Sequence, residues 1–300
     1  MQFSGKPWRA ACVVLPLLSA NCADERSDTI EQPWPTRVVI TNDDGFDSRA
    51  TLALAQAFSR LAETYLIVPA QNQSSGTNFA TAARTSRFEV EIRDVGSGIN
   101  AWAVDGYPAD CVFFALAGPM REDPPDLVIS GINTGANLAD AWVLSGTIGA
   151  ARLAAYYGVR SIAVSGIDEE DAGAVGAVVA WVVEFAQSEA VRHTQPPQFL
   201  TVSLPVGPAS GISGVEITER ARGLRDMRAL LLSEDSIGQG RQTWSFDVVR
   251  DPFPAPQNTD AVAVQQGNIA IVAMRTDESD PELLGWLKRN KDRIPAWPIP

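Results

Sequence analysis

The chain of 300 residues has one histidine, three cysteines and more acidic than basic side chains. Because the only histidine, His193, lies in a polar stretch that we expect at the surface, a Ser-His-Asp or Cys-His hydrolase is nearly excluded. A zinc site is disfavoured for the same reason, since zinc prefers cysteine and histidine ligands. No Gly-x-Gly-x-x-Gly or Gly-x-x-x-x-Gly-Lys-Ser/Thr loop occurs, which argues against a dinucleotide or Walker-type phosphate site.

The charge balance is also one-sided, with 24 basic against 36 acidic residues and a net charge of −12 at pH 7. Such a surface argues against a nucleic acid polymer as a partner. The content of 45% hydrophobic and 20% charged residues is typical of a globular protein large enough for one sizeable α/β domain.

Residues 1–23 have the pattern of a secretory signal peptide. Lys6 and Arg9 precede an uncharged run over residues 10–20, which is too short to span a bilayer as a helix. We therefore expect an exported protein, periplasmic or secreted, with the acidic residues 24–36 as a linker. Membrane attachment is expected only if Cys22 is lipidated, and the other interpretation is a mobile extension of a cytosolic protein.

Short apolar runs alternate with helical patterns after the linker, which predicts a doubly wound parallel sheet in residues 37–205. The expected strands are residues 38–40, 65–68, 126–130, 161–164 and 199–204, with a hairpin pair at 88–92 and 101–104. The expected helices are residues 49–61, 109–117, 148–157 and 172–186. Residues 206–300 predict a C-terminal antiparallel extension with strands at 215–218, 243–248 and 269–272, a Pro-rich loop at 251–259 and a helix at 281–288.

Two adjacent carboxylates, Asp43 and Asp44, end the first expected strand. The carboxyl ends of parallel strands are where ligands bind in open α/β sheets. Because the two side chains repel each other, a divalent cation with oxygen ligands is a natural partner. The alternative is a solvated turn, since Asp-Gly is ordinary turn chemistry.

Two further loops, residues 70–81 and 131–147, are rich in amides, hydroxyls and glycine and follow later strands. We expect all three loops to converge on one edge of the sheet, although a plain surface turn is the other interpretation of residues 70–81. Their oxygen-bearing side chains suit one divalent cation (Mg²⁺, Mn²⁺ or Ca²⁺) better than zinc. The helix that begins at Ser145-Gly146-Thr147 offers backbone N–H groups to an anion.

Five sequence blocks resemble the SurE (survival protein E) family of nucleotidases, in the order and spacing of that family. The blocks are Val-Ile-Thr-Asn-Asp-Asp-Gly (39–45), Pro-Ala-Gln-Asn-Gln-Ser-Ser-Gly-Thr (69–77), Gly-Tyr-Pro-Ala-Asp-Cys-Val (106–112), Asp-Leu-Val-Ile-Ser-Gly-Ile-Asn-Thr-Gly-Ala-Asn (126–137) and Ser-Gly-Thr-Ile-Gly-Ala-Ala-Arg (145–152). The resemblance implies a Rossmann-like three-layer core and a divalent-metal-dependent phosphomonoesterase. The implied substrates are nucleoside 5′- and 3′-monophosphates and short polyphosphate, and the implied assembly is a homodimer or homotetramer that exchanges C-terminal hairpins.

Carried over residue by residue, the resemblance implies a set of metal ligands and a set of phosphate-binding residues. The metal ligands would be Asp43, Asp44, Ser74 and Asn133, and the phosphate would be faced by Asn137, Ser145, Gly146 and Thr147. One of the two aspartates would orient or deprotonate the nucleophile.

The chain departs from the family pattern at two places near these motifs. Residues 46–50 replace a small-residue and glycine segment, and Leu144 stands where an aromatic residue commonly precedes Ser-Gly-Thr.

Two other functions stay open. A phospho-accepting receiver domain would need an aspartate at the end of the third strand, where Ser130 stands. An exported, non-catalytic binding protein could use the same loops to hold a divalent cation without turnover.

Overall fold

The computed structural model describes residues 33–293, except for residues 75, 86, 97, 223–225, 235–241, 250–254 and 278–279. The expected signal peptide, Cys22 and most of the expected linker lie outside the described residues, as does part of the expected Pro-rich loop. Within the described residues, none of the helices has both the length and the apolar character that crossing a bilayer requires.

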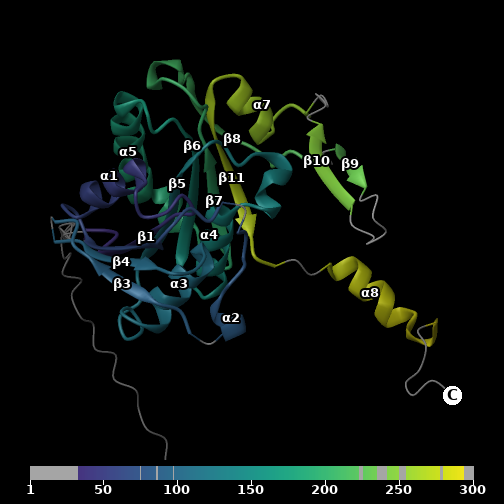
Figure 1. Ribbon diagram of the computed structural model, residues 1–300, viewed down its shortest axis with the longest axis horizontal. Coiled ribbons are helices and arrows are strands. Elements are labelled where there is room, and N and C mark those ends of the chain that lie inside the picture. Colours follow the sequence, from purple (N-terminus) through teal and green to yellow (C-terminus); the bar gives the residue numbers. More distant parts are fainter. Residues whose placement is uncertain are drawn as a thin grey trace, which may run out of the picture. The chain divides into compact units, whose positions relative to one another are not determined.

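The described residues form a main sheet with the strand order β3-β4-β2-β1-β5-β6-β7-β11-β8 (Figure 1). All neighbours from β4 to β7 are parallel, whereas β3 and β11 run antiparallel to β4 and β7. The doubly wound parallel sheet predicted from the sequence is therefore confirmed. Its strands are β1 (Arg37–Thr41), β2 (Glu63–Pro69), β3 (Val90–Arg93), β4 (Asn100–Val104), β5 (Leu127–Thr134), β6 (Arg160–Ile167), β7 (Gln198–Ser203), β8 (Gly214–Ile217) and β11 (Asn268–Arg275).

Helices cover both faces of this sheet and make the predicted three-layer core. Val38 and Ile40 of β1 pack in a cluster with apolar side chains of α1 and α5, whereas Val39 packs on the opposite face with side chains of α3 and α4. This alternation follows from the period of two along a strand. The helices are α1 (Arg49–Phe58), α2 (Ala82–Thr85), α3 (Pro108–Ala117), α4 (Gly146–Tyr156), α5 (Ala172–Gln187), α6 (Glu189–His193), α7 (Asp260–Gln265) and α8 (Pro281–Arg289), with short 3₁₀ turns η1 (Ala139–Val143), η2 (Ala209–Gly211) and η3 (Lys291–Arg293).

Residues beyond 205 contribute to two different sheets. The strands β9 (Asp226–Glu234) and β10 (Gln242–Val249) pair with each other as an antiparallel hairpin, which confirms the predicted C-terminal hairpin. The strands β8 and β11 instead extend the main sheet. The sequence did not predict β9 or α7.

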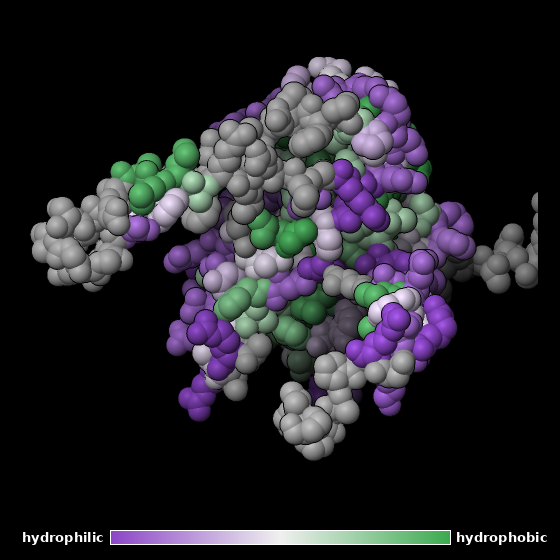
Figure 2. Space-filling view, turned by 90° about the vertical axis from the view of Figure 1, so that its right-hand side faces the viewer, coloured by the Kyte–Doolittle hydropathy of each residue, from purple (hydrophilic) through white to green (hydrophobic). Residues whose placement is uncertain are grey.

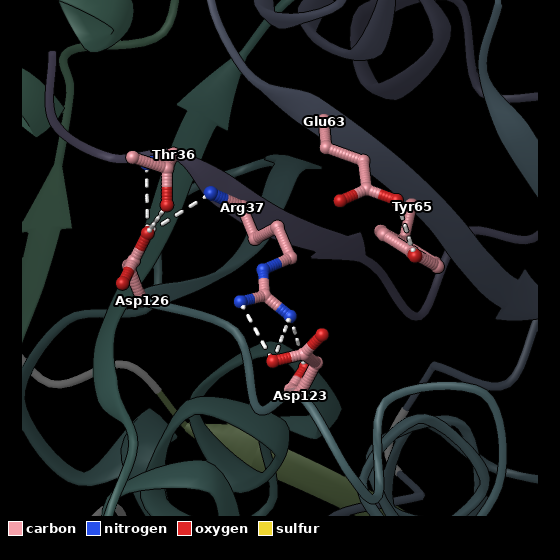
Figure 3. A network of polar contacts seen from close by, with 6 residues as sticks. All are labelled: Thr36, Arg37, Glu63, Tyr65, Asp123 and Asp126. Atoms are coloured by element: carbon pink, nitrogen blue, oxygen red, sulfur yellow. Dashed lines mark hydrogen bonds and ion pairs between the residues drawn. The ribbon is translucent and has the colours of Figure 1, made fainter.

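The beginnings of β1 and β5 are joined by one carboxylate (Figure 3). Asp126 accepts hydrogen bonds from the backbone N–H of Thr36 at 2.7 Å, from the Thr36 hydroxyl at 2.6 Å and from the backbone N–H of Arg37 at 2.9 Å. Because β1 and β5 are neighbours, this anchor fixes the two strands whose opposite ends carry the predicted site.

Candidate active site

The turn after β1 is held by Asn42, which the sequence did not single out. Its side-chain amide donates to the carbonyl of Gly45 at 2.8 Å, and its oxygen accepts from the backbone N–H of Gly45 at 3.2 Å. Gly45 has a φ of 100°, and a Cβ atom there would lie 2.8 Å from the backbone of Gln71. The Asn-Asp-Asp-Gly turn thus needs glycine so that residues 70–81 can approach it closely.

Asp43 faces the N-terminus of α4, as expected if the first and third loops converge. The hydroxyl of Thr147 donates to its Oδ1 at 2.7 Å, and a Cβ atom on Gly146 would come within 2.8 Å of its Oδ2. Burial raises the pKa of Asp43, while hydrogen bonds from Thr147 and the backbone N–H of Gly146 oppose that rise. A carboxylate at a helix N-terminus also interacts favourably with the helix dipole.

Asp44 is half-buried beside Asp43, and its Oδ2 accepts a hydrogen bond from the backbone N–H of Thr134 at 3.2 Å. Burial, the charge of Asp43 and the charge of Glu169 together raise the pKa of Asp44 to about 6, although the Thr134 hydrogen bond lowers it. Two carboxylates that each resist ionisation in the protein alone are a pair that a bound cation would stabilise.

The second loop packs on the first loop and on the segment before α4. The backbone N–H of Gln73 donates to the carbonyl of Asp43 at 2.7 Å, and the hydroxyl of Thr77 donates to the carbonyl of Val143 at 2.8 Å. Ser74, next to Gln73, is exposed, and its N–H donates to Asn72 Oδ1 at 2.9 Å. The structure thus brings the loop of Ser74 to Asp43, while no described contact joins the Ser74 hydroxyl to either aspartate.

The strand β5 extends to Thr134, beyond the expected end at residue 130, so Asn133 lies in the strand and Asn137 in the loop that follows it. The amide nitrogen of Asn133 donates to the carbonyls of Thr134 and Gly135 at 3.1 and 3.0 Å, and its side-chain oxygen takes no part in these bonds. Asn137 donates instead to the hydroxyl of Ser165 at the end of β6, at 2.7 Å. Its amide nitrogen is therefore engaged within the protein in this conformation.

The start of α4 is built as the sequence predicts. Ser145 is the N-cap residue, and its hydroxyl accepts from the backbone N–H of Ile148 at 3.1 Å. The side chain of Ser145 thus caps the helix, and the side chain of Thr147 bonds Asp43. Because Gly146 has no Cβ atom, Asp43 can approach this helix start closely and accept hydrogen bonds from the backbone N–H groups of Gly146 and Thr147.

These side chains fit a hard cation better than a softer metal. Within the described residues, no cluster of three or more His, Cys, Asp or Glu side chains is arranged for a metal. A cation at Asp43 and Asp44 would therefore complete its shell with neutral oxygens, such as those of Asn133 and Ser74, and with water, which is typical of Mg²⁺, Mn²⁺ or Ca²⁺. The exposed position of His193 at the end of α6 agrees with its predicted place at the surface.

Glu169 is a third carboxylate near Asp44, and the sequence did not reveal it. It follows β6 and accepts hydrogen bonds from the Ser48 hydroxyl at 2.5 Å and from the backbone N–H groups of Arg49 and Ala50 at 3.4 and 3.3 Å. Glu169 thus binds the N-terminus of α1, the helix that begins at Arg49 shortly after the two aspartates. Its sequence context, the acidic run of residues 168–171, is typical of a solvated loop and gives no indication of this contact.

Fold and site together define an α/β protein with a Rossmann-like sheet and an oxygen-rich site beyond the carboxyl ends of its strands. The profile of the family described as "Survival protein SurE" matches residues 38–226. The chain belongs to this family.

Relatives and a solved structure of this family cover most of the chain. A protein of Vibrio parahaemolyticus named 5'-nucleotidase SurE is 30% identical over 265 residues, covering 86% of this chain and 96% of its own length. A protein of the same name from Geotalea uraniireducens is 32% identical, with coverages of 84% and 98%. The crystal structure of SurE from Aquifex aeolicus superposes with a TM-score of 0.71 at 24% identity, over 85% of this chain and 100% of that one, and supports the same fold.

Proposed function

We propose that this protein is a nucleotidase, a divalent-metal-dependent phosphomonoesterase that hydrolyses nucleoside 5′- and 3′-monophosphates and also short polyphosphate. Relatives at 30–32% identity over most of the chain carry the name 5'-nucleotidase SurE. The observation that carries the proposal is the placement of the Asp43 carboxylate, with Asp44 beside it, against the N-terminus of α4.

The chemistry of the site supports the need for a cation. The loops at residues 70–81 and 131–147 contain no lysine or arginine, so no basic side chain of these loops can neutralise a phosphate next to Asp43. A cation held by Asp43, Asp44, Ser74 and Asn133 would neutralise phosphoryl oxygens and lower the pKa of water.

The chain's own residues would then bind and orient the substrate. Gly146 and Thr147 would face the phosphate, although in the protein alone their backbone N–H groups hydrogen-bond Asp43. Asn137 would be a further donor once it leaves Ser165. One of the two aspartates would take a proton from the attacking water. The exposed Leu144 offers an apolar surface, without stacking, to the rest of the substrate.

A phosphate-release assay tests the proposal. The substrates would be 5′- and 3′-nucleoside monophosphates, a sugar phosphate and short polyphosphate, each with Mg²⁺, Mn²⁺, Ca²⁺ or EDTA. We expect release from nucleoside monophosphates only with a cation, and its loss in Asp43→Asn. Cation binding without release from any substrate would instead identify a non-catalytic binding protein.

We further propose that the chain forms a homodimer or homotetramer through its C-terminal elements. Leu230, Leu232 and Trp244 of the β9–β10 hairpin are 54%, 64% and 46% exposed, and α8 exposes Leu283 and Trp286 at 53% and 46%. Figure 2 shows apolar surface (green) among hydrophilic surface (purple) on one face of the molecule. Exposed apolar side chains such as those of the hairpin and of α8 favour burial against another subunit. Light scattering after gel filtration should give two or four chains, and a monomer would contradict the proposal.

The exported location also remains a proposal, supported by the sequence pattern of residues 1–23. Mass spectrometry of the protein purified from its native cell should find an N-terminus near residue 24, or an acylated Cys22. An intact N-terminus at Met1 would contradict export through this segment.

A further inference from the structure

A cavity is lined by none of the residues proposed above to bind the cation or the phosphate. It has a volume of about 920 Å³ and is bounded by the end of β11, by residues 217–222, by residues 256–259 and by Trp142 of η1. Cavities of this size take ligands as large as a nucleotide. One wall belongs to η1, which ends just before the N-cap residue Ser145 of α4.

This cavity carries more positive than negative side chains, although the chain as a whole has a net charge of −12. Arg220, Arg222 and Arg275 line it, against Glu219 and Asp277. Apolar side chains supply the remaining wall. They include Ile217, Val272 and Met274. The lining therefore offers both cationic groups and an apolar surface for the uncharged part of a ligand.

The environment of the Arg220 side chain indicates that the cavity binds an anionic ligand. Its guanidinium carbon lies 4.3 Å from the centre of the Trp142 ring, and its Nη1 is buried without a hydrogen-bond partner in the described part of the chain. Burial and the charge of Arg222 lower the pKa of Arg220, and the nearby carboxylates of Asp140 and Asp260 only partly oppose this. A buried donor without an acceptor is unfavourable, so an acceptor from a ligand would be stabilised here.

Asp260, one of the two carboxylates whose charge acts on Arg220, is bonded to backbone N–H groups. Asp260 accepts from the N–H of Ala139 at 2.9 Å through Oδ2 and from the N–H groups of Ala221 and Ala261, both at 2.8 Å, through Oδ1. These bonds hold η1, the segment after β8 and the start of α7 together. Asp260 thus shapes the cavity, and among the described residues no carboxylate forms an ion pair with Arg220.

We propose that this cavity is a second anion site, which binds an organic phosphate of up to nucleotide size. The phosphate lies against Arg220 and Arg222, where Arg220 Nη1 donates to one of its oxygens. The uncharged part of the ligand packs against Ile217 and Met274. This site is separate from the proposed metal and phosphate site and does not depend on it.

Calorimetric titration of the full-length protein in EDTA tests the proposal, because removing divalent cations disables the proposed active site. The probes are AMP, inorganic phosphate and citrate. We expect AMP to bind with a Kd below about 1 mM and to bind about tenfold more weakly to Arg220→Gln and Arg222→Gln. Arg222 is exposed, so its replacement tests the site even if Arg220→Gln folds poorly.

Two control variants test whether the loss of AMP binding is specific to the arginines of the cavity. Arg121→Gln removes an exposed positive charge outside the cavity, and Asp44→Asn alters the proposed metal site; AMP binding should be unchanged in both. The proposal is overturned if AMP does not bind in EDTA, if Arg222→Gln binds as the wild type does, or if citrate alone binds. Nucleotidase activity is measured separately with Mn²⁺, so its absence would leave the binding result intact.

Discussion

The hydroxyl of Thr147 donates a hydrogen bond to Oδ1 of Asp43 at 2.7 Å, across 104 positions of sequence. This contact joins the turn after β1 to the first turn of α4. It fixes the direction of a carboxylate that would otherwise rotate about its side-chain torsions. A carboxylate oriented in this way at a helix N-terminus is what a cation site requires.

Removing this hydroxyl should impair the site while leaving the fold intact. We expect Thr147→Val to lower kcat/KM for a nucleoside monophosphate by about 10- to 100-fold, since partners that orient metal ligands have effects of this size. Thr147→Ser keeps the hydroxyl and should retain most of the activity. Steady-state kinetics with saturating Mn²⁺ gives both values, and equal activity of the valine and wild-type proteins would refute a positioning role.

Glu169 should position the aspartate turn through α1. We expect Glu169→Ala to weaken Mn²⁺ binding about tenfold, because it removes the acceptor of the Ser48 hydroxyl and of two backbone N–H groups. Glu169→Gln keeps an acceptor oxygen but loses the charge, so it separates positioning from electrostatics. The neighbouring Glu170 is exposed and pairs with Arg49 at 3.5 Å, which makes Glu170→Gln the control. If the glutamine and alanine variants of Glu169 lose the same affinity, the effect is electrostatic.

The pKa of Asp44, raised to about 6, predicts how stability depends on pH in the metal-free protein. A carboxyl whose pKa is higher in the folded state stabilises the fold fully below its unfolded pKa of about 4, and this contribution is lost as the pH rises through about 6. In EDTA, the wild type should therefore lose stability relative to Asp44→Asn between pH 4 and pH 7. Thermal melting of both proteins across this range measures the difference, and parallel curves would contradict the raised pKa.

Some parts of the site follow from local sequence and others do not. The positions of Asp43, Asp44 and the α4 start were predictable because each follows a strand pattern or a capping residue within a few positions. The contact of Glu169 with Ser48 joins residues 121 positions apart, and no local pattern encodes it. The places of β8 and β11 in the main sheet are likewise set by tertiary pairing. The local sequence of a short strand near a turn does not indicate which of two sheets the strand joins.

Asp126 should stabilise the fold through the beginning of β1 (Figure 3). Burial alone would raise the pKa of Asp126, but hydrogen bonds from Thr36 and Arg37 and the charge of Arg37 lower it below its ordinary value of 3.8. We expect Asp126→Ala to reduce the free energy of unfolding by about 1–2 kcal/mol at pH 7, a modest value because the carboxylate is partly exposed. Urea denaturation of the metal-free protein measures this loss.

Asp123 provides the matched control for that experiment. Its side chain is 79% exposed and pairs with Arg37 at 3.1 Å, so Asp123→Ala should change stability by less than about 1 kcal/mol. The pH dependence separates the two residues further. Because the pKa of Asp126 is lowered on folding, its contribution is present above the ordinary value of 3.8 and is lost as the pH falls below it. The stability difference between wild type and Asp126→Ala should therefore shrink from pH 6 towards pH 3, and a difference independent of pH would show that the carboxylate charge is not what joins β1 to β5.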